Sequence, residues 1–292
     1  MLNFLFGKDT DSHLMKQQDF TSSYQLITKT CFAMGEENPP ILISSVANID
    51  LEQIIEKKKI FTTVIFKDMT SETDNNQMQS ALQEMQLFTT VNPVIKFQRN
   101  LEGKVKGIAN KEQLWRDWEK WKTKQLPQLI PDEDKQKKVI ENYENGLSSL
   151  EDSISSNIQY MLLLPECYEF KDYPNAQDVC SYRSYHSRLI ENMNFNYQLK
   201  KQKFSTGRHQ PLSKLSLTSH ISGQEDIVHN YLTPYYTKYL PSFSHEDYLF
   251  QVKIDYEFDK NTSEIMSATL SFTEQLHSNF TYSMEMELVR KE

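Results

Sequence analysis

The stretch YLFQVKIDYEF, residues 248–258, decides the fold because apolar and polar side chains alternate along it. Every even-numbered position carries an aromatic or aliphatic side chain, whereas the odd-numbered positions from 251 to 257 are polar or charged. Successive side chains of a β-strand point to opposite faces of a sheet. The pattern therefore predicts a strand with one buried face and one solvated face.

Two segments downstream repeat this pattern. After the turn sequence DKNTSE, residues 259–264, even-numbered apolar residues run from Met266 to Phe272, and a further set runs from Phe280 to Leu288. Three consecutive strands that share one apolar face are typical of an antiparallel meander, half buried and half solvated. We expect this meander to form the C-terminal part of the protein.

The middle of the chain has a helical period. Apolar residues recur at steps of three and four between Ile140 and Met161, which predicts one long amphipathic helix. Pro131 suits its first turn and Pro165 ends it, while Gly146 is a weak point at which it could divide. The apolar stripe favours packing on the sheet, although the same seam could join two copies of the chain as a coiled coil.

The three tryptophans lie in the segment GIANKEQLWRDWEKWKTKQ, residues 107–125, which predicts a second helix with Asn110 as its N-cap. At 100° per residue the tryptophans fall on one arc of the helix, but Lys122 falls inside that arc. One interpretation is a helix packed on the sheet with lysines at its rim. The alternative is an aromatic and basic strip that binds a partner. Its candidate residues are Trp115, Trp118, Trp121 and Lys122.

The remaining elements are shorter. A helix is expected over residues 50–59, capped by Asp50, and another around residues 78–85. The segment RNLEGK, residues 99–104, is expected to be a hairpin turn. Strands are expected at residues 41–46, 60–66, 87–98, 104–108, 179–189, 194–204 and 212–221.

Together these elements predict the α+β class. The expected architecture is a mostly antiparallel, curved sheet with a C-terminal three-stranded meander, packed against the tryptophan helix and the long central helix. We expect residues 1–292 to form one domain. Its regions would be mixed strands and short helices at 1–109, helices at 110–164, and antiparallel strands at 165–292.

Composition argues against several functions. The 32 Lys and Arg against 40 Asp and Glu give a net charge of −8, which disfavours broad nucleic-acid binding. The seven glycines are scattered, and no phosphate-binding or nucleophile-elbow motif is present. We expect no cofactor. The N-terminal MLNFLFGKD is a poor secretory signal, and no apolar run approaches the length of a membrane span, so a soluble cytoplasmic protein without a membrane span is predicted.

The segment NYLTPYYTKYLPSFSHEDYLF, residues 230–250, is crowded with aromatic residues. Its prolines, Pro234 and Pro241, predict that much of it is loop. Such a loop either packs over the core or presents tyrosines to a partner, and as a lid it would also serve an apolar ligand. Its candidate binding residues are Tyr231, Tyr235, Tyr236 and Tyr239.

Histidines and acids gather in the same part of the chain. Ser222 and Glu225 are expected to form a capping box, and Glu225 shares a helix face with His229 as a candidate acid–base pair. His220, His229 and His245 are candidate metal ligands. The sequence carries none of the familiar zinc-ligand spacings, so we expect no resident metal.

We therefore expect a non-enzymatic binding or interaction protein that engages a protein partner or an apolar small molecule through aromatic surfaces. One alternative is a metal-dependent hydrolase that uses the His and Glu cluster at 220–247. Another is a structural or assembly component that dimerises through the 140–161 helix. The oligomeric state is left open.

Overall fold

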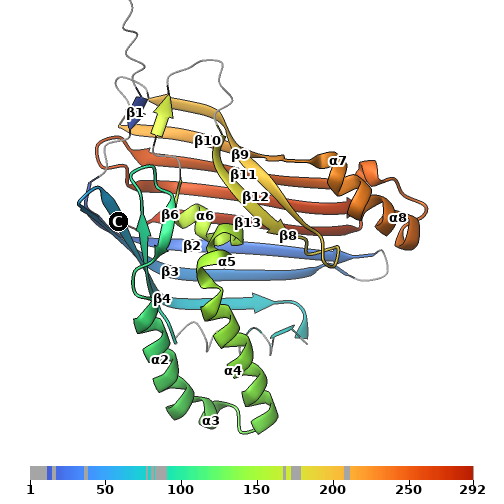
Figure 1. Cartoon of the computed structure of the whole chain (residues 1–292), viewed down its shortest axis with the longest axis horizontal. Helices are drawn as coiled ribbons and strands as arrows, with labels where there is room; N and C mark the ends of the chain where they lie inside the picture. Colours follow the sequence, from blue (N-terminus) through green and yellow to red (C-terminus); the bar gives the residue numbers. More distant parts are fainter. Residues whose placement is uncertain are drawn as a thin grey trace, which may run out of the picture.

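The computed structural model describes residues 12–14, 18–35, 39–76, 78–79, 82, 91–166, 169–171, 179–206 and 211–291. Within them, eleven strands form one large curved sheet (Figure 1). Its spatial order is β6-β5-β4-β3-β2-β13-β12-β11-β10-β9-β8, and each neighbouring pair is antiparallel. The strands are β2 (Phe20–Met34), β3 (Ile41–Glu56), β4 (Lys59–Thr73), β5 (Val94–Arg99), β6 (Val105–Ile108), β8 (Val179–His186), β9 (Asn194–Thr206), β10 (Leu212–Ile221), β11 (Leu249–Asp259), β12 (Ile265–His277) and β13 (Phe280–Arg290).

Strands from both ends of the chain share this sheet. The pairing of β13 with β2 joins them, with Leu288 opposite Leu26 and Met286 opposite Thr28. All four side chains are buried. The last strand of the chain therefore closes the contact between the N-terminal and C-terminal halves. A separate two-stranded sheet pairs β1 (Ser12–Leu14) with β7 (Glu169–Lys171).

The C-terminal meander is confirmed: β11, β12 and β13 are sequential antiparallel neighbours. The even-numbered residues from Phe250 to Phe258 are buried, as the alternation predicts. A register shift at Glu257/Phe258 places Ile265 opposite Phe258, so Ile265 is buried and Met266 is only half-buried. We call the buried side of the sheet the inner face.

The helix expected at residues 50–59 is wrong. This stretch forms the end of β3 and the turn into β4, with Lys57 and Lys58 at positive φ of 46° and 66°. Side chains alternate between buried and half-buried along β3, with Ile49 and Leu51 on the inner face. Side chains in this segment alternate with a period of two, so Asp50 lies on the other face while Gln53 is buried on the inner face. The helix expected near residues 78–85 falls largely outside the described residues.

The expected long helix is divided into three pieces. It breaks at Ser149 and again at Asn157, which is extended and accepts a hydrogen bond from the Gln159 backbone N–H, rather than at Gly146. Asp132 caps the first piece by accepting from two backbone N–H groups. The helices of this region are α2 (Lys111–Lys124), α3 (Leu126–Leu129), α4 (Glu133–Ser148), α5 (Leu150–Ser156) and α6 (Ile158–Leu163).

These helices have different neighbours. Helix α5 contacts β8 and α6 contacts β12, whereas α2 packs on α4 to form a hairpin that extends away from the sheet (Figure 1). Asn110 does not cap α2 with its side chain, because its amide instead bonds the backbone N–H of Lys96 and the carbonyl of Val94 in β5. The tryptophan helix is therefore tied to the sheet at its N-terminal end and packs along its length on another helix.

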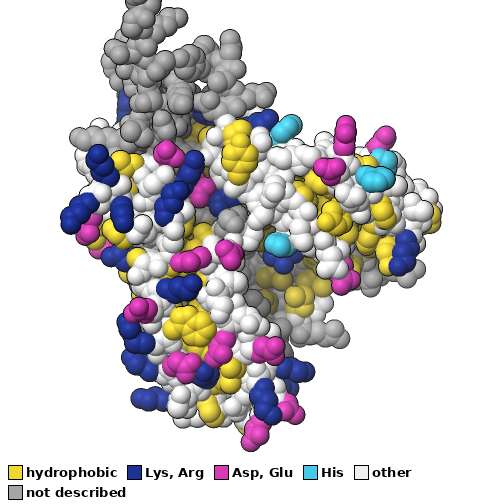
Figure 2. Space-filling view, viewed as in Figure 1, with side chains coloured by type: hydrophobic (Ala, Val, Ile, Leu, Met, Phe, Trp, Pro, Cys, Tyr) yellow, Lys and Arg dark blue, Asp and Glu magenta, His cyan; other side chains and the backbone are white. Residues whose placement is uncertain are grey.

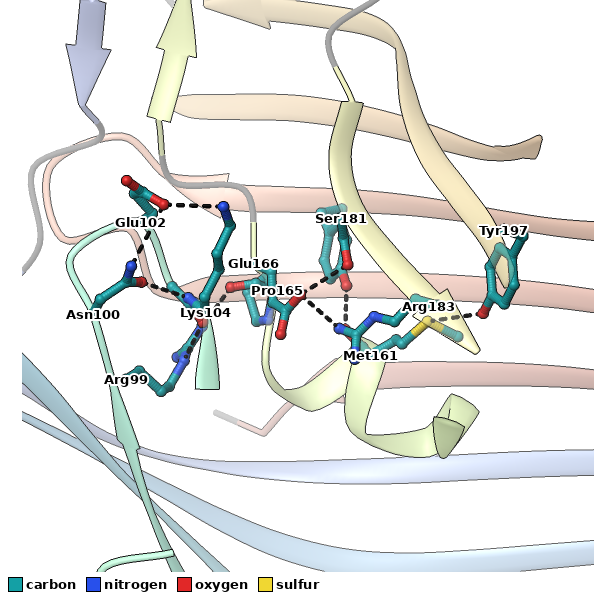
Figure 3. A network of polar contacts seen from close by, with 12 residues as sticks. Arg99, Asn100, Glu102, Lys104, Met161, Pro165, Glu166, Ser181, Arg183 and Tyr197 are labelled. Carbon is teal, nitrogen blue, oxygen red and sulfur yellow. Dashed lines mark hydrogen bonds and ion pairs between the residues drawn. The ribbon is translucent and has the colours of Figure 1, made fainter. Parts of the chain in front are cut away.

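The segment after α6 bonds to both ends of the sheet order (Figure 3). Buried Arg99 of β5 donates to the Pro165 carbonyl and to the Thr62 hydroxyl. The next residue, Glu166, accepts from Ser181 of β8 at 2.8 Å and pairs with Arg183 of β8 at 3.1 Å. Strand β8 is one edge of the sheet and β5 is next to the other edge. Residues 165 and 166 therefore connect two strands that lie near opposite ends of the strand order.

Candidate functional site

The aromatic segment expected to be loop is mostly helical. It begins in the π-helical turn η1 (Val228–Leu232), which follows α7 (Gln224–Ile227), and continues through α8 (Thr233–Tyr239) and the short 3₁₀ helix η2 (His245–Asp247). The loop prediction is wrong because Pro234 lies in the first turn of α8, where its missing N–H breaks no helical bond. The Thr233 N–H reaches back to the Val228 carbonyl, five residues earlier, so the π turn connects the two helices.

The start of α7 also differs from the prediction. Its N-cap is Gly223 at φ 68°, and no side chain caps the helix. The expected capping box of Ser222 and Glu225 is therefore absent, because the chain enters the helix through a left-handed residue that suits glycine.

A cleft of about 390 Å³ lies between this helix and the end of the sheet. It opens where β10 and β11 part: their last paired residues are Thr218 and Lys253, and the Ser219 hydroxyl then accepts from the Val252 backbone N–H at 2.8 Å. We call this the terminal cleft. Its lining residues are Ser219, His220, Ile221, Gln224, Ile227, Val228, Leu232, His245, Glu246, Tyr248, Leu249 and Phe250.

The apolar wall of the cleft is formed by side chains that pack in the main core. Ile227 and Leu232 from the helix, and Phe250 from β11, are buried members of the main core. Val228 is half-buried against the same core, while Leu249 is 42% exposed at the end of the sheet. The apolar wall is therefore continuous with the core and reaches solvent. Figure 2 shows apolar, acidic and histidine side chains together over this end of the molecule.

The histidines and acids expected to form one cluster are divided by the structure. His220 at the end of β10 and His245 in η2 both line the terminal cleft. Glu225 and His229 are exposed on the helix and do not line it. Among the described residues, no group of three or more His, Cys, Asp or Glu side chains is placed to hold a metal ion.

The four candidate tyrosines have unequal surroundings. Tyr236 is buried and donates to the Leu276 carbonyl of β12, and burial raises its pKa to about 12. Tyr231 and Tyr235 are half-buried, whereas Tyr239 is 57% exposed. The rings of Tyr235 and Tyr239 lie 5.0 Å apart, and the Lys238 ammonium lies 4.6 Å from the Tyr239 ring. Tyr236 anchors α8 to the sheet, and a partner surface at Tyr235 and Tyr239 stays a prediction.

A buried carboxylate that was not predicted from the sequence accepts a hydrogen bond from a side chain of the cleft wall. Glu274 of β12 is fully buried on the inner face. It accepts from the Tyr185 hydroxyl at 2.7 Å, the Ser187 hydroxyl at 2.5 Å, the Arg188 backbone N–H at 2.9 Å and the Tyr248 hydroxyl at 3.3 Å. The signal was present in the sequence, because Glu274 is the one charge among the alternating inner-face residues of β12.

This carboxylate also affects the two tyrosines. Burial, with the charge of Glu274 as the next cause, raises the pKa of both Tyr185 and Tyr248 well above the usual range of tyrosine. Both phenols therefore stay protonated and act as donors. Since Tyr248 lines the terminal cleft, Glu274 links the cleft wall to β12 and to the loop after β8.

The candidate residues of the tryptophan helix lie far from this cleft in the fold, on the α2–α4 hairpin (Figure 1). Trp118 is fully buried, stacks on Tyr143 at a centroid distance of 4.1 Å, and donates to Glu144 at 3.0 Å. Lys122 pairs with Glu144 at 2.8 Å and lies 5.9 Å from the Trp118 ring. Trp121 is 7% exposed and Trp115 is half-buried. The ion pair with Glu144 and the contact with the Trp118 ring explain why Lys122 lies on the apolar arc of this helix.

No helix among the described residues is long and apolar enough to cross a membrane. No protein-family model matches the chain. No curated protein matches it either. Solved structures do match the chain.

The chain is similar in fold to part of lipovitellin. The structure, titled "Lipid-protein interactions in lipovitellin", matches with a TM-score of 0.44 and 10% sequence identity. The match covers 95% of this chain and 25% of the lipovitellin chain, so this chain spans about a quarter of the length of that one.

Proposed function

We propose that this chain is a binding protein and that the terminal cleft holds a small amphipathic molecule, with an apolar body and a polar end. The observation that carries the proposal is the cleft itself, an opening of about 390 Å³ between sheet and helix. Ligand pockets are commonly concave, mostly apolar and furnished with a few polar groups, with volumes of roughly 300–1,000 Å³. The terminal cleft lies within this range of volume, and its lining combines apolar side chains with polar ones.

The build of the cleft supports a preformed site. Strands β10 and β11 separate at this point because the Ser219 hydroxyl, in place of a backbone carbonyl, accepts from the Val252 N–H. The helical wall is fixed to the sheet through Tyr236, and the Tyr248 wall is fixed through Glu274. A site that keeps its shape without ligand loses little ordering entropy on binding. The aromatic segment borders the cleft, although its candidate tyrosines do not line it.

The test is calorimetric titration of the full chain with decanol, a neutral probe with an apolar body. Val228 lines the cleft, and Val228→Trp would fill it. Val289, 39% exposed on β13, offers the matched control Val289→Trp. We expect decanol to bind the native chain and the control but not Val228→Trp. Equal binding by both variants would place the apolar site elsewhere, and absence of binding to the native chain would refute the proposal.

A further inference from the structure

The polar side chains of the terminal cleft are available to a ligand. His220, Gln224 and His245 line it from three different elements: the end of β10, helix α7 and helix η2. Their side chains form no hydrogen bond or ion pair with another described residue. Polar side chains that converge on a cleft without partners of their own are the groups that fix a ligand's orientation.

Each of these three side chains can donate hydrogen bonds to a ligand. A neutral imidazole has one N–H donor and one acceptor nitrogen, a protonated imidazole has two donors, and a glutamine amide has two N–H donors beside its accepting oxygen. A carboxylate accepts up to four hydrogen bonds, and bonds to an ionised acceptor are about twice as strong as neutral ones. Histidine is also the side chain that gains positive charge most readily near neutral pH. We infer that the terminal cleft selects an amphipathic acid whose carboxylate is bound by His220 and His245.

Glu246 is the residue of the cleft that opposes binding of an acid. It lines the same cleft, and its carboxylate disfavours an anionic ligand. Its side chain is exposed, whereas His245 is half-buried, so water screens the charge of Glu246. The other acidic and histidine side chains between residues 219 and 250 are Glu225, Asp226, His229 and Asp247, which are exposed and do not line the cleft. Removing the charge of Glu246 should therefore strengthen binding of an acid.

The inference rests on the proposed function, and a series of probes separates the two. Decanoate, decanol and decylamine share one apolar body and differ in the polar end. We expect decanoate to bind the full chain about tenfold more tightly than decanol, the difference of one charge-assisted hydrogen bond. His220→Ala and His245→Ala should each remove most of this preference without changing decanol binding. Glu246→Gln should strengthen decanoate binding. The control is His229→Ala, which alters an exposed histidine of η1 that does not line the cleft.

Each outcome decides one of the two statements. Equal affinity for decanoate and decanol, unchanged in the histidine variants, would overturn the acid preference and leave the proposed function standing. Tighter binding of decylamine, lost in Glu246→Gln, would overturn it in favour of a cationic ligand. Failure of all three probes to bind would overturn the proposed function as well. The altered histidines are exposed or half-buried, and thermal unfolding of each variant verifies its fold.

Discussion

Replacement of Glu274 tests whether the buried carboxylate holds the cleft wall in place. In Glu274→Leu, the Arg188 backbone N–H and the hydroxyls of Tyr185 and Tyr248 lose their acceptor. Each unsatisfied buried donor costs about 1–3 kcal/mol, and relief of the buried charge offsets part of the sum. We expect a loss of about 3–5 kcal/mol in the free energy of unfolding.

Glu274→Gln should cost much less. Its amide oxygen can take the place of Oε2 and accept from Arg188 and Tyr185, while the amide nitrogen faces the hydroxyls of Ser187 and Tyr248. Hydroxyls can rotate to accept, so every group keeps a partner and only the charge assistance is lost. We expect a cost of about 1–2 kcal/mol.

Urea unfolding followed by circular dichroism measures both variants, and thermal unfolding of Glu274→Leu should show a midpoint lowered by on the order of 10 °C. Glu287→Leu is the control, because Glu287 is exposed on β13 and should change stability by less than about 0.5 kcal/mol. A leucine variant as stable as the native chain, or a glutamine variant as unstable as the leucine one, would refute the account of this hydrogen-bond network.

Three further predictions concern stability. Trp118→Ala should lower the free energy of unfolding by about 3–5 kcal/mol in urea titrations, because the ring is fully buried against Tyr143; a cost below 1 kcal/mol, on the order of a surface change, would contradict that packing. Lys58→Gly should raise the free energy of unfolding by about 0.5–1 kcal/mol, since Lys58 has a positive φ of 66° in the β3–β4 turn; a lower stability would argue against that turn. Burial raises the pKa of Tyr160 and Tyr236 to about 12, above the ~10 of an unfolded tyrosine. The native state thus keeps these protons longer, so stability should be complete below about pH 10 and fall as pH rises toward 12, as alkaline unfolding curves would show; a free energy of unfolding that stays constant up to pH 12 would contradict the burial.

The strands could be predicted wherever one face is buried and the other is solvated. The meander is the clearest case, because Phe250 to Phe258 alternate without interruption. The prediction failed at the β3–β4 turn because Asp50 and Gln53 resemble the residues of a helix cap. Only the pairing of β3 with β2 and β4 shows that this segment is a strand. The union of the two halves could not be predicted, since the β2–β13 pairing joins residues more than two hundred positions apart.

The candidate site stays a prediction. The sequence pointed to the segment 230–250 for its tyrosines and to His220 and His245 as metal ligands, and the structure places parts of that segment and both histidines at the cleft. Sequence reasoning could not find the cleft, because the parting of β10 and β11 depends on a side chain of one strand bonding to the backbone of another. Nor could it separate His229 from the other two, since proximity in sequence says nothing about which side of a helix faces the sheet.

The most direct test of the central claim is to locate the bound ligand on the full chain by NMR of its isoleucine, leucine and valine methyl groups during titration with decanol. The account predicts that the methyl signals of the cleft shift together with a single affinity. Shifts confined to other methyl groups, or no shifts at all, would contradict it. The expected set is Ile221, Ile227, Val228, Leu232 and Leu249.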